Sequence, residues 1–151
     1  LIVCMGGGGF VAGCTIAAKA VQPSIHMVGA EPEAGNDGEQ SMREGRIVKL
    51  PAVPVTICDG QQTLSIGERP FAVLREHKAQ VLSVPDAVVV QAMRLAFDHL
   101  KLVVEPSGAC ALAVLMHHRQ VFAGQRVGVM LSGGNVDATR FATLLGGQRP
   151  Q

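Results

Sequence analysis

The sequence of 151 residues contains neither tryptophan nor tyrosine, and its five aromatic residues are all phenylalanine, so aliphatic side chains must build the core. None of the four cysteines belongs to a Cys-x-x-Cys pair, and a chain of this size needs no disulfide scaffold, so we expect reduced thiols. No apolar run reaches membrane-spanning length, and the first residues lack the basic region of a signal peptide. A net charge of +1 without a basic block argues against binding to nucleic acid. We predict a cytoplasmic protein that contacts neither membranes nor nucleic acid.

The chain also lacks an initiating methionine. An apolar segment, residues 1–5, stands at its start, and no other predicted strand precedes it. We therefore expect that the sequence was cut from a longer protein. Hydrophobic residues make up 48% of the chain, which is enough for one domain with a core of its own.

Strand-like and helix-like segments alternate along the chain. Short aliphatic runs predict strands at residues 1–5, 25–30, 79–84 and 126–131. Helices are predicted at residues 10–21, 39–44, within 66–78 after Pro70, and at 86–100, 110–118 and 137–145. This alternation predicts an α/β fold with three layers, α/β/α, and a mostly parallel sheet of about four strands. We expect a single domain over residues 1–145 and a disordered tail over 146–151.

Four consecutive glycines, residues 6–9, lie between the first predicted strand and the first predicted helix. Glycine lets the backbone turn sharply, and a helix start supplies free N–H groups and the positive end of a dipole. The arrangement predicts a phosphate-binding turn, although a flexible turn without a ligand would show the same pattern. No Gly-Lys-Ser/Thr follows, which excludes a P-loop, and Gly13 stands at the wrong offset for a dinucleotide fingerprint. Glu31, as an acidic partner for a ribose, keeps a nucleotide-binding interpretation open.

Two further loops combine turn residues with polar side chains. Ser132, Gly133, Gly134 and Asn135 follow the last predicted strand, and the serine or the asparagine could cap the next helix. Alternatively, the Ser132 hydroxyl could donate a hydrogen bond to the nitrogen of a neutral aromatic ring. Glu105 precedes a predicted Pro-Ser-Gly turn, where it is either an exposed or helix-capping acid or part of a pocket wall.

A third loop carries three acids, Glu31, Glu33 and Asp37. They fit an exposed acidic loop, or a site for a hard cation such as Mg²⁺ or Ca²⁺, completed by a backbone carbonyl and waters. The five histidines show no metal-ligand spacing, so a zinc site is not expected. This loop, the glycine run and the 132–135 loop each end a predicted strand. We therefore expect all three at one edge of the parallel sheet, where such folds bind ligands.

Taken together, four motifs resemble the fold-type II pyridoxal-phosphate enzymes of the threonine dehydratase and serine racemase type, which are related to the tryptophan synthase β chain. The motifs are M-G-G-G-G-F at 5–10, V-G-A-E-P-E at 28–33, V-V-E-P-S-G-A at 103–109 and V-M-L-S-G-G-N-V-D at 129–137. The resemblance covers residues 1–145 and looks like the C-terminal half of such an enzyme.

The resemblance implies a role for each motif. Backbone N–H groups of the glycine turn would hold the cofactor phosphate, Ser132 would hydrogen-bond the ring nitrogen, Asn135 would lie behind it, and Glu105 would line the ring pocket. The implied cofactor-binding residues are Gly6, Gly7, Gly8, Gly9, Phe10, Glu105, Ser132 and Asn135. Glu31, the carbonyl of Gly35, and Asp37 match the cation ligands of the racemase-like branch, which implies Mg²⁺ or Ca²⁺.

The implied chemistry is removal of the β-hydroxyl of serine or threonine, giving a 2-oxo acid and ammonia, or racemisation by reprotonation from the opposite face. One departure matters. In the family, the Schiff-base lysine and the loop that holds the substrate carboxylate lie upstream of the glycine run, and this sequence contains neither. The lysines at 19, 49, 78 and 101 stand in other surroundings. We expect that the chain does not catalyse the reaction by itself.

One consequence and two alternatives follow. Without the upstream strands and helices, apolar surface would be open to water, so we expect a homo-oligomer, in the simplest case a dimer, or a complex with a separate N-terminal polypeptide. The main alternative is a non-catalytic module, derived from such an enzyme, that binds a phosphate or nothing and self-associates. A nucleotide-binding module built on the glycine run and Glu31 is the second alternative.

Overall fold

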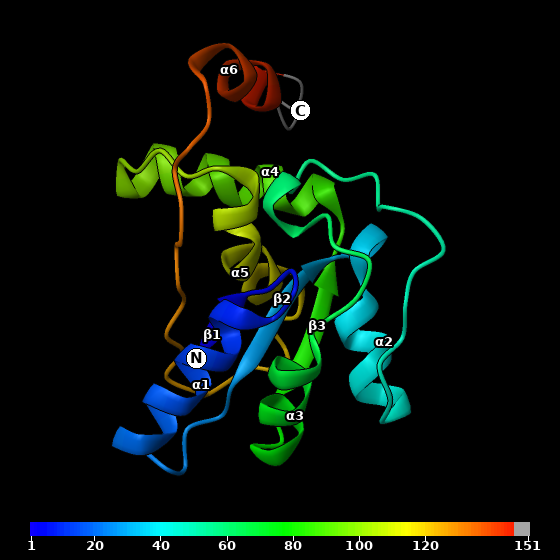
Figure 1. Cartoon of the computed structure of the whole chain (residues 1–151). Coiled ribbons are helices and arrows are strands. Elements are labelled where there is room, and N and C mark those ends of the chain that lie inside the picture. The colour runs from blue at the N-terminus through cyan, green and yellow to red at the C-terminus, as the bar shows by residue number, and fades with distance from the viewer. Residues whose placement is uncertain (147–151) are drawn as a thin grey trace.

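Three parallel strands form the sheet in the computed structural model, which describes residues 1–146 of the chain (Figure 1). They are β1 (Ile2–Cys4), β2 (Val28–Pro32) and β3 (Gln80–Val84), in the order β1-β2-β3. Ile2 pairs with Val28, and Val28 pairs with Gln80, so the amino ends of the strands are in register. All three carboxyl ends therefore meet at one edge of the sheet.

The predicted fourth strand, residues 126–131, is reduced to a single parallel bridge between Ile2 and Val129. Two hydrogen bonds hold it: Ile2 N donates to Gly128 O (2.9 Å), and Met130 N donates to Ile2 O (3.0 Å). The expectation of about four strands is thus too high by one regular strand. The physical reason is that, within β1, only Ile2 exchanges backbone hydrogen bonds with this segment, so the pairing does not extend into a ladder.

Nine helical segments lie within the described residues. The regular helices are α1 (Gly9–Val21), α2 (Asp37–Glu44), α3 (Glu68–Glu76), α4 (Asp86–Leu95), α5 (Pro106–His117) and α6 (Ala138–Gly146). Short 3₁₀ turns η1 (Glu33–Gly35) and η2 (Asp59–Gln61), and a π-helical turn η3 (Ala96–Leu100), complete the set. None of the helices among residues 1–146 is long and apolar enough to cross a membrane.

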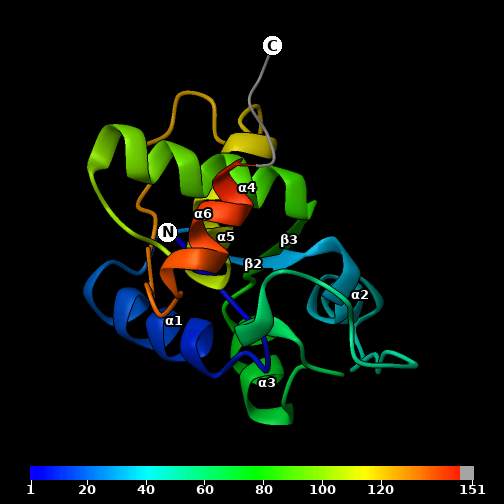
Figure 2. The same ribbon diagram turned by 90° about the horizontal axis from the view of Figure 1, so that it is seen from above.

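The helices cover both faces of the sheet, which confirms the predicted three-layer α/β fold. Figure 2, seen from above, shows α4 and α5 on one side of the strands and α1 and α3 on the other. Alternation along β1 explains the two cores: Ile2 and Cys4 pack toward α4 and α5, while Val3 and Met5 pack toward α1 and α3. Both cores are built from small and aliphatic side chains, as the aromatic-poor composition predicts.

Two boundaries differ from the prediction in ways that affect function. Pro106 starts α5, so residues 106–109 form its first helical turn and not a loop. A proline fits there because the first helical position needs no N–H donor. Glu31 lies within β2 and Asp37 begins α2, so the predicted acidic loop is shorter than expected.

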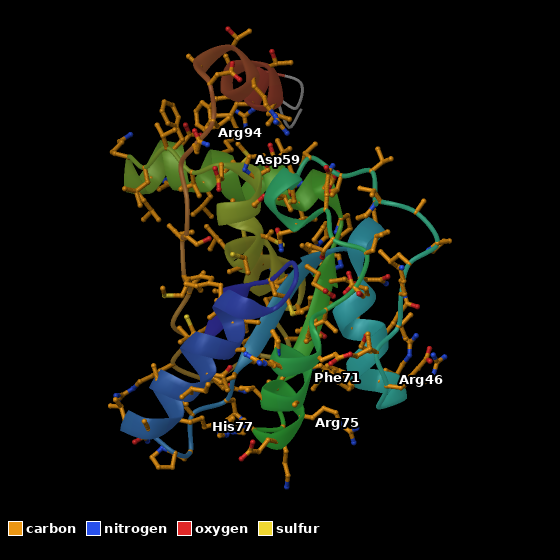
Figure 3. The ribbon with its side chains drawn as sticks, viewed as in Figure 1. Arg46, Asp59, Phe71, Arg75, His77 and Arg94 are labelled. Atoms are coloured by element: carbon orange, nitrogen blue, oxygen red, sulfur yellow. The ribbon has the colours of Figure 1, made fainter. Side chains whose placement is uncertain are left out.

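Helix α6 projects beyond the rest of the molecule and has no buried residue (Figure 1). Arg94 of α4, labelled in Figure 3, donates a hydrogen bond to the carbonyl of Leu145. Phe97 and Phe141 meet edge to face with ring centroids 5.4 Å apart. Gly146 belongs to α6, and the remainder of the predicted tail, residues 147–151, lies outside the described part of the chain.

Candidate functional site

The glycine run forms a turn that only glycine can make at its third position. Gly8 has φ +87° and ψ −6°, in the left-handed region, and serves as the N-cap of α1. A Cβ atom there would come within 2.7 Å of Pro70 Cβ and 2.9 Å of Ile66 Cγ1. Both the backbone conformation and the packing therefore exclude a side chain at this position.

The turn leaves the first amides of α1 without a side-chain cap, and no acidic residue stands in the first helical turn. A Cβ at Gly7 or Gly9 would meet no atom within 4 Å, so the space in front of the turn is open. Phe10 follows with 47% of its surface exposed. Free N–H groups, a helix dipole and open space give the turn the features of an anion site.

Ser132 lies beside the point where β1 enters this turn. Its hydroxyl is 2.9 Å from the Cys4 thiol sulfur. The parallel bridge between Ile2 and Val129 explains the approach, because both segments then run to the same edge of the sheet. The structure thus brings together two motifs that are more than 120 residues apart in the sequence.

Glu105 and the 132–135 loop also meet at this edge. Glu105 N donates to Gly133 O (3.0 Å), and a Cβ at Gly133 would overlap the Glu105 carboxylate. Glu105 occupies the N-cap position of α5, yet its side chain caps no amide there. Asn135 is exposed. Neither it nor Ser132 caps α6, because Asp137 Oδ1 accepts the hydrogen bond of Arg140 N (2.8 Å).

The interpretation of Glu31 as part of an exposed acidic loop is wrong. Its side chain is 1% exposed and faces the start of α2, where Oε1 accepts from Gly38 N (3.0 Å) and Oε2 accepts from Glu39 N (2.9 Å). Burial raises the pKa of Glu31 to about 8, although the two amide donors oppose the shift. Glu31 therefore acts as a buried cap for α2, contributed by the neighbouring strand.

Asp37 is also fully buried, whereas Glu33 is exposed as expected. Neither carboxylate oxygen of Asp37 has a hydrogen-bond partner among the described residues. Burial raises its pKa to about 6. Within residues 1–146, no group of three or more His, Cys, Asp or Glu side chains could hold a metal. The predicted set of Glu31, the Gly35 carbonyl and Asp37 contains only two such side chains and stays a prediction.

Gln61 is a residue of this site that the sequence reasoning missed. It is 2% exposed, and its Nε2 donates to Met5 O, just after β1, and to Ala30 O, within β2, each at 2.8 Å. A Cβ at Gly6 would lie 3.2 Å from Gln61 Cα, so the 56–62 loop packs directly against the glycine turn. The side-chain oxygens of Gln61 and the nearby Thr63 are buried and have no hydrogen-bond partner among residues 1–146. No periodicity or motif in the sequence signals such a long-range contact.

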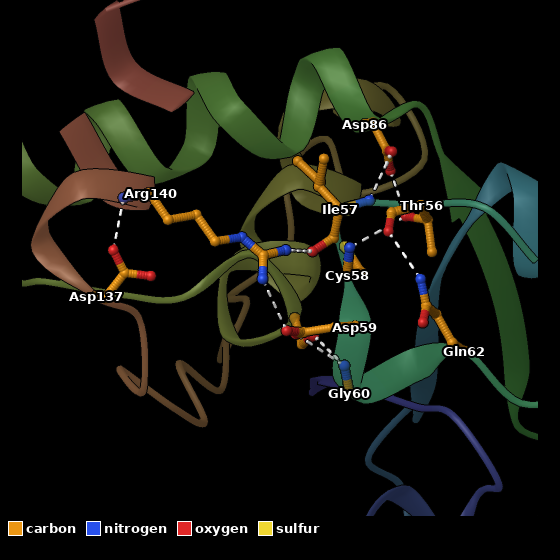
Figure 4. A network of polar contacts seen from close by, with 10 residues as sticks. Thr56, Ile57, Cys58, Asp59, Gly60, Gln62, Asp86, Asp137 and Arg140 are labelled. Atoms are coloured by element: carbon orange, nitrogen blue, oxygen red, sulfur yellow. Dashed lines mark hydrogen bonds and ion pairs between the residues drawn. The ribbon is translucent and has the colours of Figure 1, made fainter. Parts of the chain in front are cut away.

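The 56–62 loop is held from two sides, as Figure 4 shows. From α6, Arg140 donates to Asp59 Oδ2 and to Ile57 O, each at 3.0 Å. From α4, Asp86 accepts from Thr56 Oγ1 (2.6 Å) and from Ile57 N (2.9 Å). These contacts tie the wall of the glycine turn to the helix that follows the 132–135 loop.

Replacing Arg140 with alanine should lower the free energy of unfolding by less than about 1 kcal/mol, because Arg140 and Asp59 are both largely exposed to solvent. The same change should speed amide hydrogen exchange in the 56–62 loop, since the loop loses its contacts to α6. Hydrogen exchange with mass spectrometry checks this, with the exposed Arg119→Ala as the control. Unchanged exchange in Arg140→Ala would contradict it.

The four lysines lie away from the turn or are engaged elsewhere. Lys19, ten residues into α1, donates to Pro23 O (3.0 Å), and Lys101 donates to Asp98 O (2.7 Å). Lys49 follows α2 in an irregular segment, and Lys78 follows α3 in a left-handed conformation with φ 51°. Nothing in their placement makes one of them a nucleophile for this site.

Known proteins are similar to this chain in sequence and in fold. The family profile described as "Pyridoxal-phosphate dependent enzyme" matches residues 1–133. An L-threo-3-hydroxyaspartate ammonia-lyase from Pseudomonas sp is 45% identical over 147 residues, which are 97% of this chain and 46% of that protein. A threonine deaminase from T.th. matches with a TM-score of 0.85 and 43% identity, over 90% of this chain and 49% of that structure. Maize serine racemase matches with a TM-score of 0.85 and 37% identity, over 91% and 43%.

The chain therefore spans about half the length of the relatives it matches. The profile match includes the glycine turn, the buried acids Glu31 and Asp37, and Ser132, and it ends at Gly133. The sequence and fold comparisons agree: the chain belongs to the fold-type II family of pyridoxal-phosphate dependent enzymes.

Proposed function

We propose that this chain forms the cofactor-holding part of an ammonia-lyase or racemase that acts on a small hydroxy amino acid. One observation carries the proposal: an uncapped helix start with a left-handed Gly8 and the Ser132 hydroxyl lie at the same edge of the sheet. An anion site and a neutral hydrogen-bond donor at that edge are the two features needed at opposite ends of a phosphorylated pyridine. The relatives are named as an ammonia-lyase, a deaminase and a racemase, which supports the reaction class.

The residues present fit the two ends of the cofactor. The amides of Gly6, Gly7, Gly8, Gly9 and Phe10 would hold the phosphate, because the turn supplies N–H groups and no competing carboxylate. Ser132 would donate to the ring nitrogen, Glu105 would line the pocket through its contact with Gly133, and Asn135 would lie behind the ring.

When bound, pyridoxal 5′-phosphate supplies an electron sink for the bonds at the substrate Cα. Ser132 carries no charge, so it would leave the ring nitrogen unprotonated and weaken that sink, which suits loss of a β-hydroxyl. This chain would bind the cofactor and orient its ring. Because its lysines lie elsewhere, we propose that catalysis requires a lysine from outside this sequence, and that the chain alone is inactive.

The cation site forms a separate part of the proposal. Glu31, the Gly35 carbonyl and Asp37 would bind Mg²⁺ or Ca²⁺, and the unpartnered, buried carboxylate of Asp37 supports this, because such a group is costly without a counter-charge.

The exposed apolar side chains of Phe97, Leu100 and Val103 support association with a second polypeptide, for which we propose a dimer. Free cysteines support a cytoplasmic location.

Equilibrium titration of the chain with pyridoxal 5′-phosphate and with pyridoxal tests the phosphate site. We expect the phosphate to raise affinity at least tenfold. Gly7→Asp should abolish most of this gain, because its carboxylate would occupy the free amides and repel the phosphate. Gly13→Asp, within α1 and also in open space, carries the same charge change and should retain the gain.

Equal affinity for the two compounds would contradict the proposal. If the phosphate group still raises the affinity of the Gly7→Asp variant, the anion site lies elsewhere. Binding of inorganic phosphate without any preference for the pyridine ring would favour the alternative of a non-catalytic phosphate-binding module.

A further inference from the structure

Cys4 stands between the core and the proposed cofactor site. It is the last residue of β1, its backbone leads through Met5 into the glycine turn, and its side chain packs in the core beneath α5. Its sulfur lies 2.9 Å from the Ser132 hydroxyl oxygen. Ser132 itself is exposed, and Cys4 is the hydroxyl's hydrogen-bond partner within residues 1–146.

The direction of this hydrogen bond decides what Ser132 can do. A hydroxyl has one hydrogen and two lone pairs, so Ser132 can donate to a ring nitrogen only if it does not donate to sulfur. Burial raises the pKa of the Cys4 thiol, which therefore keeps its hydrogen at neutral pH. The thiol can then donate to the hydroxyl oxygen and leave the hydroxyl hydrogen free to point into the site.

We propose that Cys4 is a positioning residue for the cofactor ring: its thiol donates to Ser132 Oγ, and so directs the Ser132 hydroxyl hydrogen toward the pyridine nitrogen. The inference rests on the proposed function and extends it to a residue outside the cofactor-binding set. Cys4 does not touch the ring in this arrangement and acts through Ser132.

Two other buried thiols, those of Cys58 and Cys110, lie in the same core with no exposed surface, and neither sulfur makes a hydrogen bond to Ser132. Cys110, on α5, is therefore a matched control. Its replacement by alanine removes a buried sulfur from the same core and leaves the Cys4–Ser132 pair in place.

The experiment compares two probes bound by the 151-residue chain. The first is pyridoxine 5′-phosphate, which has no aldehyde and cannot condense with surface lysines. The second is its 1-deaza analogue, in which a C–H group replaces the ring nitrogen. We expect Cys4→Ala to weaken binding of the first probe about fivefold, the usual size of one lost hydrogen bond, and to leave binding of the analogue unchanged. Cys4→Ser, which keeps a donor, should restore the affinity, and Cys110→Ala should preserve the ratio of the two affinities.

A second readout is the ¹⁵N chemical shift of the ring nitrogen in labelled pyridoxine 5′-phosphate. It should move toward the shift of a free pyridine nitrogen in Cys4→Ala and return in Cys4→Ser. Equal weakening of both probes, or no change in either, would show that Cys4 only packs and would overturn the inference while leaving the cofactor site intact. Failure of the parent chain to bind either probe would overturn the proposed function and the role of Cys4 with it.

Discussion

Replacing Gly8 with alanine will lower the free energy of unfolding by about 3 kcal/mol. The left-handed backbone at Gly8 costs an alanine roughly 1–2 kcal/mol, and the contacts with Pro70 and Ile66 add an overpacking cost of about the same size. Urea denaturation followed by circular dichroism measures this effect. Affinity for inorganic phosphate should fall as well, since the turn cannot keep its shape.

Gly13→Ala is the matched control on the same helix. A Cβ there meets nothing within 4 Å, and alanine is the better helix former, so this change should stabilise the chain by about 0.5–1 kcal/mol. Opposite signs for the two substitutions would establish that conformation and packing at Gly8, and not the loss of glycine itself, cause the destabilisation. A loss under about 0.5 kcal/mol in Gly8→Ala would contradict the left-handed turn.

The second large effect concerns pH: stability will fall as pH rises from about 4 to 8. The usual pKa is 3.8 for Asp37 and 4.5 for Glu31, and burial raises these pKa values to about 6 and about 8 in the folded chain. Between those values the folded state holds protons that the unfolded state has lost, so stability declines with rising pH. The raised pKa of Asp37 corresponds to a contribution of at most about 3 kcal/mol to the free energy of unfolding. This contribution is fully present below pH 4 and is lost as the pH rises through 6.

Asp37→Asn tests this directly, because the amide cannot ionise. The variant should lose less stability than the parent as pH rises through 6, because only the contribution of Glu31 remains, and thermal denaturation at several pH values measures the difference. Glu33→Gln makes the same change of charge at an exposed neighbour and should retain the parent's pH dependence. An identical pH dependence in Asp37→Asn and the parent would show that Asp37 is not buried as a titrating acid.

The same variants test the proposed cation site. Mg²⁺ or Ca²⁺ should raise the midpoint of thermal unfolding of the parent at pH 8, where Asp37 is ionised and Glu31 is about half ionised, and should have little effect at pH 5.5. Asp37→Asn should lose this response, and Glu33→Gln should keep it. A response that persists in Asp37→Asn would remove Asp37 from the site.

Sequence reasoning succeeded where the signal is local. The aliphatic run at residues 1–5, the glycines after it and the helix that follows give β1, the turn and α1 in the expected order. The observed boundaries of β2 and α5 differ from the predicted ones. Glu31 joined β2 because β3 pairs with it through Ser83, and Pro106 joined α5 because proline suits a first helical position.

The sequence by itself determined the order of strands and helices, the place of the glycine turn and the motifs that mark the family, because these depend on side-chain periodicity and backbone preference over a few residues. Only the tertiary structure decided that Glu31 and Asp37 are buried, that Gln61 ties β1 to β2, and that Cys4 meets Ser132. Burial and hydrogen bonding between distant segments depend on which parts of the chain pack together, and no local pattern records that.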